Sequence, residues 1–220
     1  MLKLRIKEFF VSAKIVLATS SKYRKELMKR LAVSFISASP GIDEKRKPKE
    51  SAYSLARRLS EEKSQSQAYV YTDHLIIGSD QVAILNPLKL DPSNLNAPSF
   101  ISKPCMQEDA VFITKPDGRE EAFNQLKAQS GQRVTFLTGV AVLDTRRNSI
   151  ETSVVITEIL FRKLHEKEIN NYLTKDTPYD CAGSLRTESC GISLLDAVYS
   201  SDPTALIGLP LIQLRKMLRI

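Results

Sequence analysis

The hydrophobic residues of this chain fall into short continuous runs and into stretches with helical spacing. Short apolar runs bounded by polar or small residues are typical of buried strands. We expect strands at residues 14–19, 34–39, 75–85, 134–144, 150–161 and 206–209. Apolar positions three or four residues apart, flanked by Ser, Gly or Pro, are typical of amphipathic helices. We expect helices at residues 22–31, 51–68, 119–129, 165–173 and 210–218.

The order of these elements predicts an α/β fold. Strands and helices alternate along most of the chain, which is the pattern of a sheet covered by helices. The turn at 146–149 joins two strands directly, so we expect a β-hairpin there and a mixed sheet. Four prolines interrupt residues 86–110, which we interpret as an insertion or long loop. Residues 1–13 are interpreted as an N-terminal extension, which leaves 14–220 as a single domain.

The composition is that of a globular protein from a reducing compartment. Hydrophobic residues make up 42% of the chain and charged residues 26%, which is more apolar material than a disordered chain holds. Three cysteines without a CxxC spacing argue against a zinc site or a disulfide framework. No apolar run approaches the roughly 18 residues of a membrane span. We therefore expect no membrane partner and a cytoplasmic location.

The positive charge is concentrated in the first part of the chain. The formal net charge is +7, and residues 1–63 hold 16 Lys and Arg against 7 Asp and Glu, a surplus of +9. The rest of the chain carries a net charge of −2. Such a surplus indicates either an anionic partner or a solvated basic face. The basic run at 45–49 has no interleaved aromatic residues, so we expect a solvated loop and no nucleic-acid partner.

A hydroxyl-rich turn follows the first expected strand. Thr19, Ser20 and Ser21 come just before a helix that Ser20 or Ser21 can cap. The free backbone N–H groups and the dipole of a helix N-terminus attract anions. Arg24 and Lys25 are unfavourable to the dipole in this first turn, and a bound anion would explain them. The turn is therefore a candidate anion site.

Asp80 is the most unusual residue of the sequence because it interrupts an apolar strand. A buried carboxylate is costly unless it is paired or binds a metal. Three cations (Arg24, Lys63 and Lys115) and a second carboxylate, Glu44, complete a set that suits hydrolysis of a phosphate anhydride. Taken singly, Lys63 and Glu44 would more often be solvated residues. Neither a P-loop motif nor a Rossmann glycine motif occurs in the sequence.

Seven segments together resemble the Maf family of nucleoside triphosphate pyrophosphatases, and the resemblance covers nearly all of residues 14–214. They are 17–27 (LATSSKYRKEL), 42–44 (IDE), 58–63 (RLSEEK), 78–82 (GSDQV), 114–116 (TKP), 181–192 (CAGSLRTESCGI) and 202–211 (DPTALIGLPL). Each motif alone is weak, but the set is specific. The resemblance implies a Maf/Ham1-like (ITPase-like) α/β fold, with an elongated central mixed sheet flanked by helices, and a homodimer.

The resemblance also implies roles for individual residues. Asp80 would be the proton acceptor, and Glu44 and Asp80 would hold a divalent cation, Mg²⁺ or Mn²⁺. Lys63 and Lys115 would complete the catalytic set. Substrate binding and specificity would belong to six further positions, which are Thr19, Ser21, Tyr23, Arg24, Gln81 and Glu188.

The specificity positions resemble one branch of the family. Gln81 follows the central Asp where another subgroup has Thr, and Tyr23 stands where that subgroup has Arg. With segments 181–192 and 202–211, these markers imply hydrolysis of 7-methyl-GTP to 7-methyl-GMP and pyrophosphate, a house-cleaning role against modified nucleotides. Two alternatives remain: a Maf-type pyrophosphatase acting on dTTP, UTP or other modified nucleotides, and a non-catalytic nucleotide-binding regulator of septum formation.

The chain departs from the family pattern at three places. Thr19 replaces the serine that is usual in the first motif, which keeps a hydroxyl there. Lys22 replaces the proline that is usual in the first motif, which makes a less rigid turn there. The interval between Gln81 and Lys115 is about 20 residues longer than the family pattern, an unusual length for a loop. This interval contains a second Lys-Pro pair at Lys103. We assign the motif to Lys115 because only its spacing to Ser-Gly at 130–131 fits.

Overall fold

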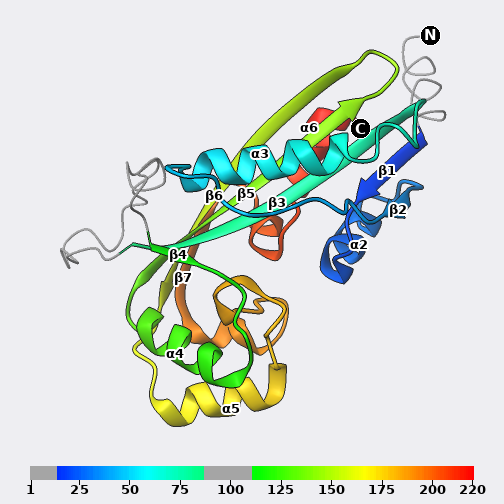
Figure 1. The fold of residues 1–220 in the computed structure, drawn as a ribbon. Coiled ribbons are helices and arrows are strands. Elements are labelled where there is room, and N and C mark those ends of the chain that lie inside the picture. The colour runs from blue at the N-terminus through cyan, green and yellow to red at the C-terminus, as the bar shows by residue number, and fades with distance from the viewer. Residues whose placement is uncertain (1–13, 87–110) are drawn as a thin grey trace.

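A seven-stranded mixed sheet runs through the length of the molecule (Figure 1). The computed structural model describes residues 14–86 and 111–220. The strands are β1 (Lys14–Ala18), β2 (Ile36–Ala38), β3 (His74–Asn86), β4 (Val111–Ile113), β5 (Arg133–Asp144), β6 (Ser149–Phe161) and β7 (Leu195–Ser200). Their order is β2-β1-β3-β5-β6-β7, with β4 paired to β3. Strands β2 and β3 pair parallel with β1, and the other pairs are antiparallel.

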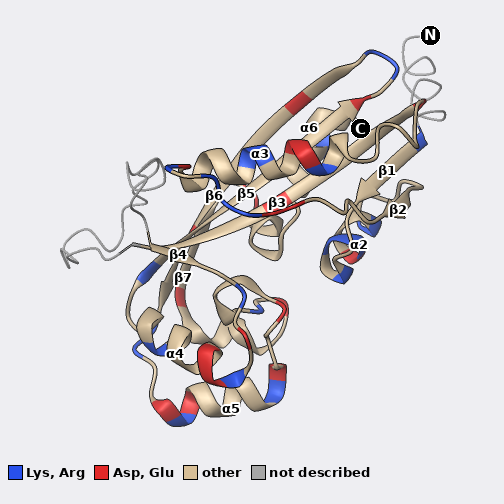
Figure 2. Cartoon of the chain, in the orientation of Figure 1, with Lys and Arg blue, Asp and Glu red and all other residues tan. Residues whose placement is uncertain are grey.

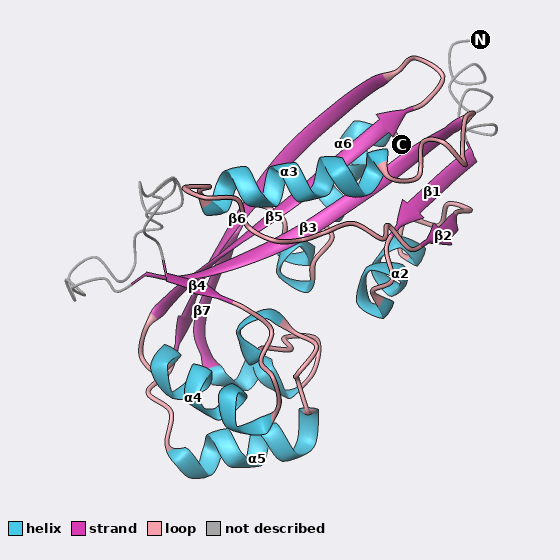
Figure 3. Ribbon diagram, in the orientation of Figure 1, coloured by secondary structure: helices cyan, strands magenta, loops and turns pink. Residues whose placement is uncertain are grey.

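The helices cover both faces of this sheet and one of its ends (Figure 3). The α-helices are α2 (Lys22–Lys29), α3 (Ala52–Gln65), α4 (Arg119–Gln129), α5 (Glu166–Asp176) and α6 (Leu211–Leu218). Three 3₁₀ helices, η3 (Ala182–Ser184), η4 (Cys190–Leu194) and η5 (Pro203–Ile207), lie in the C-terminal part of the chain.

Helix α3 lies against the sheet at unusually close range. Its apolar face, which includes Leu55, packs on Val82 and Leu137 of β3 and β5. A Cβ atom at Gly78 would lie 2.1 Å from the backbone oxygen of Ser60, so this strand position has room only for glycine. Because alternate residues of a strand share a face, Gly78, Asp80 and Val82 all face α3. The close contact therefore brings the end of α3 next to Asp80.

The opposite face of the sheet is covered by α2 and α6. Leu27 of α2 and Leu214 of α6 are buried in one apolar cluster with Ile77 and Val140 of the sheet. Burial of such side chains contributes about 25 cal/mol per Å² of apolar surface. This cluster holds the start of α2 beside the centre of β3.

A further core forms where the long hairpin meets α4 and α5, at the end of the sheet away from α3 (Figures 1 and 3). Leu126 of α4 and Leu173 of α5 pack there with Phe136 and Phe161 of the hairpin. The chain after α5 runs back from this end and contributes η3 and η4. This path brings residues 176–191 toward the middle of the sheet.

The structure confirms the predicted α/β class, its mixed sheet with flanking helices and the β5–β6 hairpin. The strand predicted at 206–209 is wrong, because Asp202 caps a 3₁₀ helix there by accepting from Thr204 N, and Pro203 begins that helix. Strands β4 and β7 were not predicted. The predicted extension 1–13 and nearly all of the predicted insertion 86–110 lie outside the described residues.

Charged residues occur in all five α-helices of the described chain, and Figure 2 colours the charged residues of the chain blue and red. Each of these helices therefore has a polar face toward solvent as well as an apolar face toward the sheet or a neighbouring helix. Among the residues that the structure describes, no helix has the length and the apolar character needed to cross a membrane.

Candidate functional site

The predicted site residues meet around one cavity of about 620 Å³. The cavity lies between the start of α2, the end of α3, the centre of β3 and the segment that follows α5. All ten residues proposed from the sequence line it: Thr19, Ser21, Tyr23, Arg24, Glu44, Lys63, Asp80, Gln81, Lys115 and Glu188. Residues separated by up to 169 positions are thus brought to one place by the fold.

The hydroxyl-rich turn forms one wall of the cavity. Ala18 at the end of β1 pairs with Gly78 of β3, so the turn that follows β1 lies beside Asp80. Thr19 Oγ1 accepts a hydrogen bond from Ser21 N at 3.1 Å. Ser21 caps α2, as predicted, by accepting from Arg24 N at 3.4 Å. The start of α2 therefore faces the cavity, where its dipole suits an anion.

A lysine lies between the two predicted metal-binding carboxylates. Lys63 Nζ is 2.5 Å from Asp80 Oδ1 and 2.7 Å from Glu44 Oε1. The side chains of Lys63 and Asp80 are 4% and 9% exposed, whereas that of Glu44 is 53% exposed. Burial raises the pKa of Glu44, but the stronger combined effect of Lys63, Lys115 and Arg24 lowers it. Glu44 is therefore held in its charged form.

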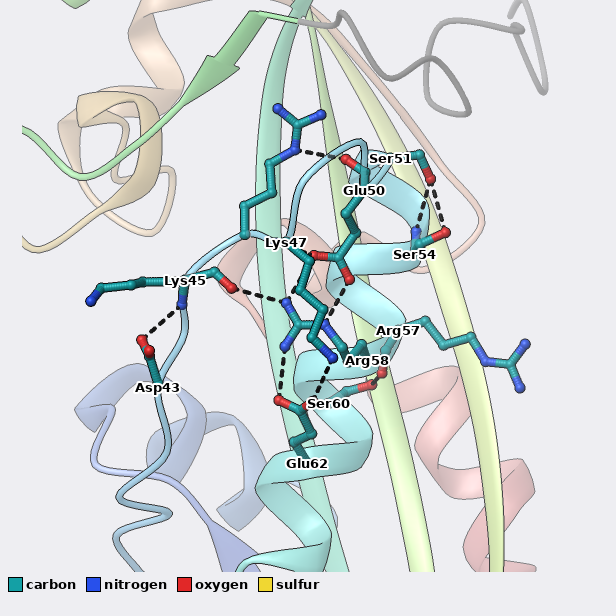
Figure 4. Close-up of polar contacts among 11 residues, drawn as sticks. Asp43, Lys45, Lys47, Glu50, Ser51, Ser54, Arg57, Arg58, Ser60 and Glu62 are labelled. Carbon is teal, nitrogen blue, oxygen red and sulfur yellow. Dashed lines mark hydrogen bonds and ion pairs between the residues drawn. The ribbon is translucent and has the colours of Figure 1, made fainter.

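The segment that carries Glu44 is tied firmly to α3 (Figure 4). Arg58 donates to both carboxylate oxygens of Glu50, at 2.6 and 2.8 Å, and to Glu62 at 2.9 Å. It also donates to the backbone oxygen of Lys45 at 3.0 Å. Such bidentate, charge-assisted bonds are among the strongest in proteins. They fix the backbone just after Glu44 relative to the helix that carries Lys63.

The two other cations reach the cavity from different elements. Arg24 Nε donates to the backbone oxygen of Gly208 at 2.8 Å, which orients the side chain across the start of α2. Burial lowers the pKa of Arg24, and the charges of Asp80 and Glu44 act in the opposite direction. Lys115 follows β4 and is exposed to solvent. One end of the cavity thus combines three cations with two carboxylates.

Tyr23 marks the other end of the cavity, where it meets the segment after α5. The Tyr23 hydroxyl donates to Asp180, at 3.0 and 3.2 Å from the two carboxylate oxygens. Arg186 donates to the same carboxylate at 2.8 Å. Glu188 also lines this region, and partial burial raises its pKa. This end of the cavity therefore combines an aromatic ring with two carboxylates, of which Asp180 is paired with Arg186 and Lys22.

Gln81 is held by the backbone of η5. Its side-chain nitrogen donates to the backbone oxygens of Ala205 and Leu206, at 2.9 and 3.0 Å, and also lies 3.1 Å from Thr138 Oγ1. Because an amide nitrogen has only two hydrogens, the carbonyl oxygen of Gln81 is the part of this side chain that suits a donor on a ligand.

Glu44 and Asp80 are two carboxylates in this cavity that could serve as ligands of a magnesium or manganese ion. One oxygen of Glu44 and one of Asp80 each contact Lys63 Nζ, which lies between the two carboxylates. In the described ranges 14–86 and 111–220, no group of three or more His, Cys, Asp or Glu side chains could hold a metal. Mg²⁺ commonly uses one or two carboxylates and takes its remaining ligands from phosphate oxygens and water. Two carboxylates are therefore a sufficient donor set.

Asp180 is a charged cavity residue that sequence reasoning missed. It lies in a loop without hydrophobic periodicity, and its partner Tyr23 is 157 positions away. The signal available in the sequence was its place directly before the 181–192 motif. An acidic residue in a loop is usually solvated, so that signal alone could not single it out.

Comparison with known proteins places the chain in a family. The family described as Maf-like protein matches residues 14–220. A protein of Pseudomonas aeruginosa named 7-methyl-GTP pyrophosphatase is 42% identical over 204 residues, which are 93% of this chain and 94% of the relative. A protein of the same name from Pseudomonas syringae pv. tomato is 41% identical, with the same coverage.

Two solved structures are also similar. The Ham1 protein of Staphylococcus aureus aligns with a TM-score of 0.40 and 12% identity, over 68% of this chain and 72% of that one. A HAM1 protein of Coxiella burnetii aligns with a TM-score of 0.40 and 16% identity, over 70% and 75%. The match over residues 14–220 and the identity to the two relatives decide the assignment: this chain belongs to the Maf-like protein family.

Proposed function

We propose that this protein hydrolyses 7-methyl-GTP to 7-methyl-GMP and pyrophosphate. One observation carries the proposal: a single cavity has three cations with a buried carboxylate at one end and an aromatic ring with two carboxylates at the other. The first end suits a triphosphate, and the second suits a positively charged base. Both relatives described above are named for this substrate.

The cationic end would bind the triphosphate and stabilise the charge that develops on it. The start of α2 presents backbone N–H groups, and Arg24, Lys63 and Lys115 present positive charge. Preorganised donors of this kind act on the charge of the transition state without having to reorganise. Because Arg24 is fixed by Gly208 and Lys63 by Asp80, both cations are oriented before substrate arrives.

Asp80 is the residue that we propose as the proton acceptor. A water oxygen attacks the α-phosphorus and forms a new P–O bond, while the bond from that phosphorus to the oxygen bridging the α- and β-phosphates breaks. Pyrophosphate leaves with the electron pair, and the proton of the water passes to the Asp80 carboxylate. Lys63, in contact with Asp80, holds this carboxylate in the orientation needed for the transfer.

Glu44 and Asp80 would hold Mg²⁺ or Mn²⁺ together with the phosphates. When bound, such an ion neutralises phosphate charge and polarises the reacting centre. The segment tied down by Arg58 keeps Glu44 in place for this task (Figure 4). We also propose a homodimer in the cytoplasm. The activity requires no nucleic-acid partner.

The opposite end would select the base. A guanine methylated at N7 carries a delocalised positive charge, which is attracted to the face of an aromatic ring and to carboxylates. Tyr23 supplies the ring and Glu188 a carboxylate, both in the cavity wall. Gln81 offers its carbonyl oxygen to the N–H groups of a guanine. Ordinary GTP has a neutral base and would lose the charge-dependent part of this binding.

Measured release of pyrophosphate tests the proposal. Purified protein with Mg²⁺ is given 7-methyl-GTP, GTP, dTTP or UTP, with Asp80→Asn as the inactive control. We expect 7-methyl-GTP to have the highest kcat/KM and Asp80→Asn to release almost no pyrophosphate. Equal rates on all four nucleotides would reject the substrate assignment. No release from any of them would instead favour a nucleotide-binding regulator.

A further inference from the structure

One hydrogen bond joins the two walls of the cavity at its base end. Tyr23 belongs to the first turn of α2, and Asp180 belongs to the segment after α5. The Tyr23 hydroxyl lies 3.0 Å from one oxygen of Asp180 and 3.2 Å from the other. Both residues also line the cavity. The contact therefore sets where the Tyr23 ring stands relative to the opposite wall.

Asp180 is itself anchored by several donors. Arg186 donates from Nη2 at 2.8 Å, and Lys22 Nζ lies 3.3 Å away. Arg186 is in turn fixed by its bond to the backbone oxygen of Asp176. Partial burial raises the pKa of Asp180, but the hydrogen bonds from Arg186 and Tyr23 outweigh it and lower the pKa to about 2. Asp180 is therefore a fixed anion and not a group that exchanges protons near neutral pH.

Two cations of the protein lie beside the ring that Asp180 holds. Lys22 Nζ lies 4.9 Å from the centre of the Tyr23 ring, and the guanidinium carbon of Arg186 lies 5.5 Å from it. A cation within about 6 Å of a ring centre is attracted by its π electrons. Tyr23, Lys22 and Asp180 line the cavity, and Arg186 lies behind them in contact with Asp180.

Stability alone is a poor explanation of this arrangement. The Asp180 side chain is 47% exposed and that of Lys22 is 70% exposed, and ion pairs at such exposure contribute about 0–1 kcal/mol. The contact also has a geometric effect, because without it the Tyr23 ring can turn about its side-chain bonds. Fixing a ring before the ligand arrives removes part of the entropic cost of binding.

We propose that Asp180 is a positioning residue for substrate selection, which holds the Tyr23 ring at the base end of the cavity while Arg186 holds Asp180. The inference rests on the proposed function, since it concerns how the same cavity distinguishes a methylated, positively charged guanine from a neutral one. It assigns to Asp180 an effect on base selection that passes through Tyr23 and leaves the phosphate chemistry untouched.

A double-mutant cycle tests this relationship. The variants are Asp180→Asn, Tyr23→Phe and the combination of both, and the readouts are kcat and KM for 7-methyl-GTP and GTP and the Kd of 7-methyl-GMP. We expect each single variant to raise KM and Kd for the methylated nucleotide about tenfold and to change kcat less than twofold. The combination should be no worse than Tyr23→Phe alone, because that variant already removes the hydrogen bond whose charged acceptor Asp180→Asn weakens.

Control variants separate this effect from a loss of folding. Tyr23→Phe keeps the ring and removes only the hydroxyl, so it tests the contact even if Asp180→Asn is unstable. Asp73→Asn changes an exposed carboxylate in the turn before β3 and should leave kcat, KM and Kd unchanged. Additive losses in the double variant, or a loss of kcat on both nucleotides, would overturn the positioning role.

Failure of the proposed function has a different signature. It would appear in the unaltered protein, as an absence of preference for 7-methyl-GTP over GTP. The present inference fails if the unaltered protein shows the preference and Asp180→Asn or Tyr23→Phe retains it in full. Failure of the substrate assignment is thus measured on the unaltered protein, and failure of the positioning role is measured on the two variants.

Discussion

Lys63 Nζ lies 2.5 Å from Asp80 Oδ1 at the boundary between α3 and β3, where the two side chains are 4% and 9% exposed. A pair buried this deeply adds little net stability, because the cost of removing both charges from water offsets their attraction. Its value is that it gives the Asp80 carboxylate a hydrogen-bond donor within an apolar strand. The contact also fixes both side chains at the wall of the cavity.

Lys63→Met should destabilise the protein more than Asp80→Asn. Removing the lysine leaves a buried carboxylate without its partner, which typically costs about 3–5 kcal/mol. Removing the Asp80 charge leaves Lys63 in contact with Glu44 at 2.7 Å, so the expected loss is about 1 kcal/mol. Urea denaturation measures both, and the Lys63→Met/Asp80→Asn double variant should recover most of the larger loss. Equal losses in the two single variants would contradict the asymmetry.

Lys115→Ala should reduce kcat with 7-methyl-GTP about 10²–10³-fold, the usual effect of removing one donor to a developing charge. Because Lys115 is exposed, the melting temperature of the Lys115→Ala variant should stay close to that of the unaltered protein. The matched variant is Lys103→Ala, which changes the second Lys-Pro pair, outside the described residues. We expect it to leave kcat unchanged within about twofold. The reverse result would move the motif from Lys115 to Lys103.

Gly78→Ala should separate α3 from β3. The added Cβ would lie 2.1 Å from Ser60 O and 2.6 Å from Ser64 N, both backbone atoms that cannot move alone. Overpacking of this kind costs about 1–3 kcal/mol, and the shift would also carry Lys63 away from Asp80. We expect a lower melting temperature together with a large loss of pyrophosphate release. Glu151→Ala, a change at an exposed position of β6, should retain activity; retained activity in Gly78→Ala would contradict the argument.

Features encoded by neighbouring residues were predictable from the sequence. The Ser21 cap and the β5–β6 hairpin follow from local patterns, and the motif set identified the ten candidate site residues from the sequence alone. Strand β7 was missed because its residues are half-exposed and form no apolar run. The contact between Tyr23 and Asp180 was missed because it joins residues 157 positions apart. A contact between residues far apart in the sequence depends on the whole tertiary structure, which a local sequence pattern does not specify.

The contribution of Glu50 to the free energy of unfolding should depend on pH. The Arg58 and Glu50 side chains are 16% and 8% exposed, and the hydrogen bonds from Arg58 lower the pKa of Glu50 from its ordinary value of 4.5. A carboxyl group whose pKa is lowered on folding stabilises the protein above its unfolded pKa, and this contribution disappears as the pH falls through the lowered value. The contribution of Glu50 should therefore be complete at pH 7 and should decline below about pH 4.5.

Glu50→Gln should accordingly reduce the free energy of unfolding by about 1–3 kcal/mol at pH 7, and the difference from the unaltered protein should shrink steadily as the pH falls below 4.5. Urea denaturation at intervals from neutral to acidic pH measures this difference directly. Glu120→Gln, which changes an exposed carboxylate on α4, should give a small difference at every pH. A difference for Glu50→Gln that stays constant through acidification would show that the Arg58 contact contributes through packing rather than through the carboxylate charge.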